Sequence, residues 1–173
     1  YDRLVGSEMC IRDSLEGHAL TIRMIQKISF PYLLLLVTGG HTQLIIVKGV
    51  GDYERLGTTI DDALGEAYDK TAKSLNLGYP GGPIIENLAE IGDGSAISFP
   101  RPLYNSKEMN FSFSGLKTAV KQEIDSSLPI NEKLRSNICA AFQDSVIDIL
   151  ENKLQMAVDY FKKNYSNDVD VVL

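Results

Sequence analysis

The sequence has few of the residues that mark disulfide-bonded, zinc-finger or membrane proteins. Its 173 residues include no tryptophan and only two cysteines, Cys10 and Cys139. Two cysteines without CxxC or paired Cys–His spacing argue against a disulfide scaffold and a zinc finger, and they favour a reducing cytoplasm. The longest unbroken apolar run, Tyr32–Val37, is far shorter than the ~18 residues of a membrane-spanning helix, so we expect no membrane association.

Positive charge is also scarce. Lysine and arginine number 17 against 23 aspartates and glutamates, which gives a formal net charge of −6. This balance argues against binding nucleic acid through overall charge, but it leaves room for a local basic patch or a basic partner. An apolar content of 44% and a charged content of 23% are typical of a globular chain, and the length suits one domain.

The two ends of the sequence indicate a partial domain. Residues 1–14 show no helical or strand period, and VGSEMCIRDS resembles a peptide that recurs at the ends of metagenomic translations. We therefore expect residues 1–14 to be a non-native leader. Residues 169–173 are typical of a strand that stops without a turn, although a strand needs a sheet around it. The expected domain is residues 15–173, truncated at both ends.

Apolar periodicity and turn signals predict a mixed α/β chain. Helices are expected at residues 15–28, 61–75, 83–91, 115–124 and 131–163, and strands at 32–37, 42–47, 53–59, 111–113 and 169–173. Asp61 and Asn131 are the expected N-caps of the helices that follow them, because their side chains can accept from open amides. Hairpin strands, then helices, then a strand favour an α/β layer with antiparallel strands at one edge.

The predicted hairpin turn is the first candidate site. Thr38, Gly39, Gly40 and His41 separate the two apolar runs. Glycines without Cβ let a phosphate approach the backbone amides, and the threonine adds a hydroxyl. The same residues also suit an ordinary tight turn, and a lone histidine is more often a turn or core residue than a catalyst. The pattern alone leaves both interpretations open.

A second glycine pair and one aspartate form further candidates. Gly81 and Gly82 precede an expected helix, whose open amides favour an anion or a hydroxyl, and Glu86 would face the same opening. The glycines are equally consistent with residues that only mark the boundary of a helix. Asp69 lies four residues before Lys73, which also allows a solvated i,i+4 ion pair.

Five segments taken together resemble one family. In order they are LEGHAL, LLVTGGHTQLI, TTIDDALGEAYDKTAKSLNLGYPGGP, FPRPL and FSFSGLKTAV. From about Leu15 to Leu173 the sequence resembles the bacterial type of the TsaD family, the tRNA N6-adenosine threonylcarbamoyltransferases formerly described as O-sialoglycoprotein endopeptidases. The resemblance implies an actin-like ATPase (ASKHA) fold of two lobes, of which this sequence covers about one. It also implies transfer of the threonylcarbamoyl group from threonylcarbamoyl-AMP to N6 of the adenosine next to the tRNA anticodon.

The resemblance also implies site residues, a metal and partners. By matching position, the expected substrate-binding residues are Leu36, Val37, Thr38, Gly39, Gly40, Asp69, Gly82 and Glu86. His18 matches the second histidine of the family's His-x-x-x-His motif for one iron or zinc ion, and Ser14 stands where the first should be. The family's third metal ligand and its asparagine loop would follow Leu173. Expected partners are tRNA and accessory proteins like TsaB and TsaE.

Two other functions remain as alternatives. An actin-like kinase or ATPase would use the same glycine hairpin for nucleotide phosphates, but TIDDALGEAYDK matches the transferase family and no kinase motif. A non-catalytic scaffold lobe is favoured by the missing metal ligands and opposed by the retained Asp69 and Gly82. A protease is not expected, because no His-Glu-x-x-His motif is present. We expect the parent to be a transferase and this chain alone to be inactive.

Overall fold

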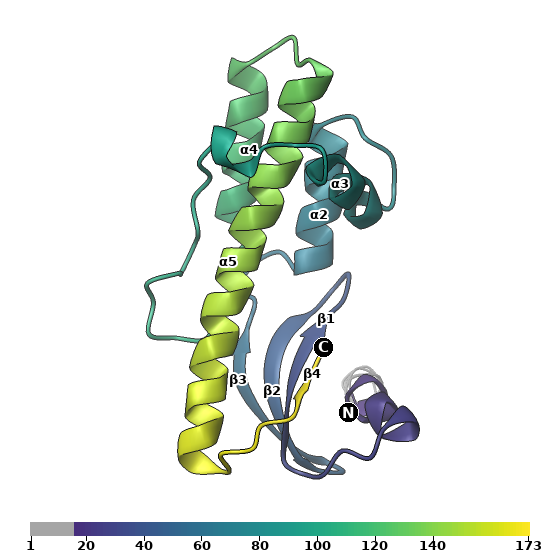
Figure 1. Cartoon of the computed structure of the whole chain (residues 1–173), viewed down its shortest axis with the longest axis vertical. Coiled ribbons are helices and arrows are strands. Elements are labelled where there is room, and N and C mark those ends of the chain that lie inside the picture. Colours follow the sequence, from purple (N-terminus) through teal and green to yellow (C-terminus); the bar gives the residue numbers. More distant parts are fainter. Residues whose placement is uncertain (1–15) are drawn as a thin grey trace, which may run out of the picture.

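A four-stranded sheet forms one end of the molecule, and a group of helices forms the other (Figure 1). The structure, a computed structural model, describes residues 16–173, so the predicted leader 1–14, including Ser14, lies outside the described residues. The 33-residue helix α5 (Glu132–Asn164) runs along both parts and joins them. Asn131 caps it as predicted, since its side chain accepts from the N–H of Leu134 at 2.7 Å.

The sheet confirms the predicted hairpin and its third strand. Its strands are β1 (Tyr32–Val37), β2 (Thr42–Gly49), β3 (Asp52–Thr58) and β4 (Val171–Val172), in the order β3-β2-β1-β4. The first three are antiparallel neighbours, whereas β4 lies parallel to β1. The strand predicted at 169–173 is thus two residues long, and the one predicted at 111–113 is reduced to a single bridge between Thr59 and Phe111.

Both faces of the sheet are covered, which explains the unbroken apolar run of β1. Leu33 and Leu35 point into the main core with residues of α5. Leu34 and Leu36 point to the opposite face, where Ala19 of the helical residues 16–25 packs against them. Successive side chains of a strand alternate between faces, so a strand covered on both sides is apolar at every position.

The remaining helices are α2 (Leu64–Ser74), α3 (Gly81–Ala89) and α4 (Ser114–Ser126), with the short 3-10 helix η1 (Gly94–Ala96) before the loop to α4. α3 begins two residues before the predicted start at Pro83. No helix within residues 16–173 is both long and apolar enough to cross a membrane.

The predicted capping role of Asp61 is wrong. Ala63 precedes α2, and the first amide of that helix, on Leu64, donates instead to the Thr42 hydroxyl at 2.8 Å. The Asp61 carboxylate accepts from the N–H groups of Phe113 and Ser114, at 2.8 and 3.3 Å, at the start of α4. Asp61 therefore stabilises a helix start that lies about 50 residues further along the chain, as the separations of 52 and 53 positions show.

Candidate functional site

Hydrogen bonds within the hairpin turn hold its shape, and its two glycines are exposed. The N–H of Thr38 donates to the carbonyl of His41 at 2.8 Å, and the Thr38 hydroxyl accepts from the N–H groups of Gly40 and His41 at 3.2 and 2.9 Å. A Cβ added at Gly39 or Gly40 would meet no atom within 4 Å. The glycines are therefore not needed for internal packing, and their backbone is accessible to a ligand.

The first turn of α2 supports this hairpin. A Cβ added at Gly65 would lie 3.0 Å from the Cα of Gly39 and 3.0 Å from the carbonyl oxygen of Thr38. The missing side chain of Gly65 thus allows the two backbones to approach. Together with the bond from Leu64 to Thr42, this contact fixes the turn against the helix that carries Asp69.

Asp69 joins α2 to α3 and does not form the solvated pair that its spacing allows. Its Oδ1 accepts from the N–H of Gly81 at 2.8 Å. Among the described residues no ion pair joins Asp69 to Lys73; the neighbouring Lys70 pairs instead with Asp62 and Glu66, each at 2.7 Å. The carboxylate therefore holds the second glycine segment in place and keeps one oxygen for other contacts.

The two glycines of that segment have different surroundings. A Cβ at Gly81 would lie 2.7 Å from the carbonyl oxygen of Tyr68 and 2.8 Å from the Cα of Asp69, so only glycine fits there. A Cβ at Gly82 would meet no atom within 4 Å. Gly81 is thus a packing residue, and Gly82 has an open backbone.

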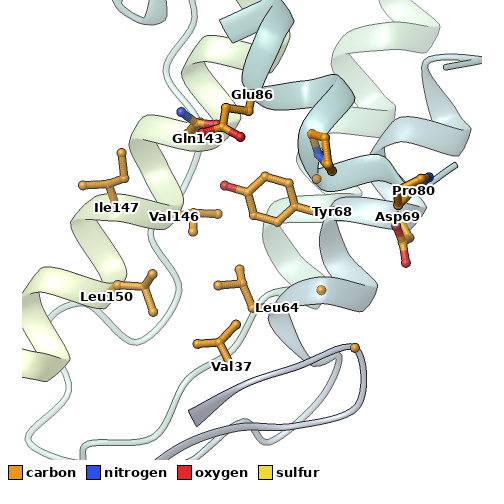
Figure 2. A pocket seen from close by; sticks show the side chains of 14 residues that line it. Val37, Leu64, Tyr68, Asp69, Pro80, Glu86, Gln143, Val146, Ile147 and Leu150 are labelled. Atoms are coloured by element: carbon orange, nitrogen blue, oxygen red, sulfur yellow. The ribbon is translucent and has the colours of Figure 1, made fainter. Parts of the chain in front are cut away.

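Five of the predicted substrate-binding residues line one cavity of about 620 Å³, bounded by α2, α3 and α5. They are Val37, Gly39, Asp69, Gly82 and Glu86. Figure 2 shows Glu86 close to Gln143 at one end of the cavity and Val37 close to Leu64 at the other. The volume is within the usual range of sites for small ligands, about 300–1,000 Å³.

Most of the other wall was not anticipated from the sequence. It consists of Leu64, Tyr68, Gln143, Val146, Ile147 and Leu150, four of which belong to α5. The ring of Tyr68 projects between the helices (Figure 2). Burial and the nearby Glu86 carboxylate raise the pKa of Tyr68 to about 12, so its hydroxyl stays protonated at neutral pH. The cavity therefore combines an apolar wall with a few polar groups.

The other predicted site residues lie elsewhere. Thr38 and Gly40 belong to the hairpin turn but do not line the cavity. Leu36 is 7% exposed and packs on the opposite face of the sheet. His18 is exposed in the helical residues 16–25, which cover that opposite face. Residues 16–173 contain no group of three His, Cys, Asp or Glu side chains that could hold a metal ion.

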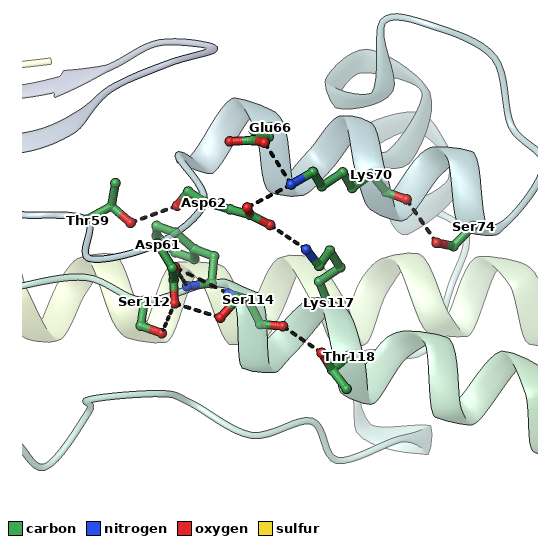
Figure 3. A network of polar contacts seen from close by, with 11 residues as sticks. Thr59, Asp61, Asp62, Glu66, Lys70, Ser74, Ser112, Ser114, Lys117 and Thr118 are labelled. Atoms are coloured by element: carbon green, nitrogen blue, oxygen red, sulfur yellow. Dashed lines mark hydrogen bonds and ion pairs between the residues drawn. The ribbon is translucent and has the colours of Figure 1, made fainter.

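A charged network ties α2 to α4 (Figure 3). Asp62 accepts from Lys70 at 2.7 Å and from Lys117 at 2.6 Å. Although burial alone would raise it, the pKa of the Asp62 carboxyl is lowered by these two lysines. The network holds the helix of Asp69 in a fixed position relative to α4.

These features define a mixed α/β chain with open glycine backbones around a ligand-sized cavity. The family model described as tRNA N6-adenosine threonylcarbamoyltransferase, TsaD, matches residues 11–167, and the chain belongs to this family. The resemblance noted in the five sequence segments is thereby confirmed, and the fold is part of the family's actin-like ATPase fold.

Curated relatives carry the same family name. The chain is 58% identical over 160 residues to the tRNA N6-adenosine threonylcarbamoyltransferase of Bartonella bacilliformis, which covers 92% of this chain and 44% of the relative. It is 55% and 54% identical over 151 residues to those of Brucella suis and Brucella ovis, covering 87% of this chain and 42% of each relative. The chain thus spans less than half the length of these relatives.

Proposed function

We propose that this chain is the part of a tRNA N6-adenosine threonylcarbamoyltransferase that holds the acyl adenylate, threonylcarbamoyl-AMP. The observation that carries the proposal is the meeting of Gly39, Asp69, Gly82 and Glu86 around one cavity in a member of this family. The family match also favours the transferase over the kinase and scaffold alternatives.

Each group on the cavity wall suits one part of an adenylate. The open backbones of the hairpin glycines allow close approach of a phosphate or an acyl group. The carboxylates of Asp69 and Glu86 are acceptors for ribose hydroxyls, and such charge-assisted hydrogen bonds are the stronger kind. The apolar side chains of α5 offer a surface for a purine ring.

The main requirement that this reaction places on the protein is to orient the two substrates. The N6 amine of the acceptor adenosine attacks the carbamoyl carbon, a C–N bond forms, and the bond from that carbon to the phosphate oxygen breaks. AMP leaves, and the amine loses a proton. Because the acyl group is already activated, holding both substrates in line contributes more than a strong base would. The packed hairpin, α2 and α3 supply that rigidity.

The proposal extends to a metal ion and to partners. We expect one iron or zinc ion in the complete parent, with His18 as one ligand. The described residues alone do not fit such an ion, because they bring no three donors together, so no step is assigned to it. We further propose tRNA as substrate, TsaB-like and TsaE-like accessory proteins as partners, and the cytoplasm as the location.

Calorimetric titration of AMP into this chain tests the adenylate site. Asp69→Asn keeps an oxygen that can accept from Gly81 but removes the charge. We expect this variant to weaken AMP binding by about 1–3 kcal/mol, the usual worth of a hydrogen bond to a charged group. Asp125→Asn, on the exposed side of α4, is the matched control and should leave binding unchanged. Equal affinities for Asp69→Asn and the unmodified chain would contradict the proposal.

A further inference from the structure

A second cavity lies beside α2. Its volume is about 680 Å³, and its lining includes Gly39, Asp69, Lys73, Asn76 and Tyr79. Gly39 and Asp69 also line the 620 Å³ cavity that we propose for the adenylate. The two cavities are therefore neighbours that share the hairpin turn and the Asp69 carboxylate.

One wall of this cavity is formed by the exposed aromatic side chain of Tyr79. It lies in the turn between α2 and α3, and it is 83% exposed. An aromatic ring left open beside a cavity is a stacking surface for a planar group, and unpaired RNA bases commonly stack on such rings.

Two lysines line the cavity, and the positive charge of one of them is available to a ligand. Lys70 is held between Asp62 and Glu66. Lys73 is exposed and forms no ion pair with any described residue. With a net charge of −6, the chain does not attract RNA through its overall charge, so RNA binding would depend on local cations such as Lys73 beside the ring of Tyr79.

We infer that this second cavity receives an unpaired adenosine of an RNA loop, with its base stacked on Tyr79 and an adjacent phosphate near Lys73. The inference rests on the proposed function, which requires an acceptor adenosine beside the adenylate. Reacting atoms must come within about 3–3.5 Å of each other. Two cavities that share Gly39 and Asp69 lie next to each other and so allow such an approach, whereas a cavity that shares no residue with the first is less suited to it.

The absence of tryptophan allows a direct test, since Tyr79→Trp introduces a single fluorescent indole. The probe is an anticodon stem-loop RNA with an adenosine beside the anticodon, compared with the same RNA carrying an abasic site there. We expect the first RNA to quench the indole emission and the second to quench it much less. Tyr104→Trp, at a 42% exposed tyrosine in the loop before α4, is the matched control and should not be quenched.

Binding affinities complete the test. Tyr79→Ala should weaken binding of the adenosine RNA about tenfold, within the usual range for base stacking, and Tyr79→Phe should restore it. Lys73→Ala should weaken binding and lower the slope of log affinity against log salt by roughly 0.7, whereas Lys121→Ala on the exposed side of α4 should not.

The possible results separate this inference from the proposed function. If AMP binds with dependence on Asp69 but RNA leaves the indole at position 79 unquenched, the second cavity is not an RNA site and the adenylate proposal stands. Equal losses for Tyr79→Ala and Tyr104→Ala would also overturn the inference. If AMP alone quenches the indole, the cavity takes free nucleotide and the assignment is wrong. Quenching by RNA without any AMP binding would support the RNA site and refute the adenylate site.

Discussion

Gly81 and Gly82 are adjacent in α3, but an added methyl group is expected to have opposite effects at the two positions. At Gly81 the new Cβ would lie within 2.8 Å of two backbone atoms of α2, so the helices would have to separate. Such overpacking costs about 1–3 kcal/mol. The higher helix propensity of alanine returns at most ~1 kcal/mol.

The expected result for Gly81→Ala is a loss of about 1–2 kcal/mol of unfolding free energy, equivalent to a fall in Tm of roughly 2–8 °C for a chain of this size. Gly82→Ala meets no atom within 4 Å. Its lower unfolded-state entropy should raise stability by about 0.4–1 kcal/mol. Gly82 lines the 620 Å³ cavity that we propose for the adenylate, so the same methyl group should weaken AMP binding about tenfold, the effect of a small steric overlap.

Differential scanning calorimetry and AMP titration of the two variants check this reasoning. Gly81→Ala should lose stability, and Gly82→Ala should lose affinity without losing stability. A Gly82→Ala variant that unfolds more easily than Gly81→Ala would show that the assignment of packing and open glycines is reversed. Unchanged AMP affinity in Gly82→Ala would show that the ligand does not approach this backbone.

Three further predictions follow from other parts of the chain. Lys153, 0% exposed, donates to the carbonyls of Leu103, Ser106 and Glu108. Lys153→Met should therefore cost about 3 kcal/mol of unfolding free energy in urea titrations, because three carbonyls lose a charged donor, and a loss below 1 kcal/mol would be inconsistent with this. The pKa of Asp61 is lowered from 3.8: burial opposes the shift, but hydrogen bonds from Ser112, Phe113 and Ser114 outweigh it. Its contribution should therefore be complete above pH 3.8 and lost as pH falls through the lower folded pKa, so the stability gap to Asp61→Asn should close in acid and not in alkali. Zinc titration with a competing chelator should show only weak binding by this chain, since His18 is a single imidazole; tight stoichiometric binding would mean that our metal-site assignment is wrong.

The sequence determined the elements whose signals are local. The apolar runs on either side of Gly39 and Gly40 define the β1–β2 hairpin, and the 3.6-residue periodicity with the Asn131 cap defines α5. The order and wording of its segments also identified the family. These features are predictable because a strand alternation, a helical stripe or an N-cap depends on residues a few positions apart.

The tertiary structure decided which distant residues meet. Asp61 looks like a cap for the helix that follows it, but it stabilises the start of α4, and Asp69 accepts from Gly81 and not from Lys73. Much of the apolar wall of the 620 Å³ cavity comes from α5, and the two glycines of α3 differ only through what α2 places beside them. A periodic pattern specifies that a side chain or backbone will be buried, but its partner depends on how the elements pack, which nothing in the local sequence encodes.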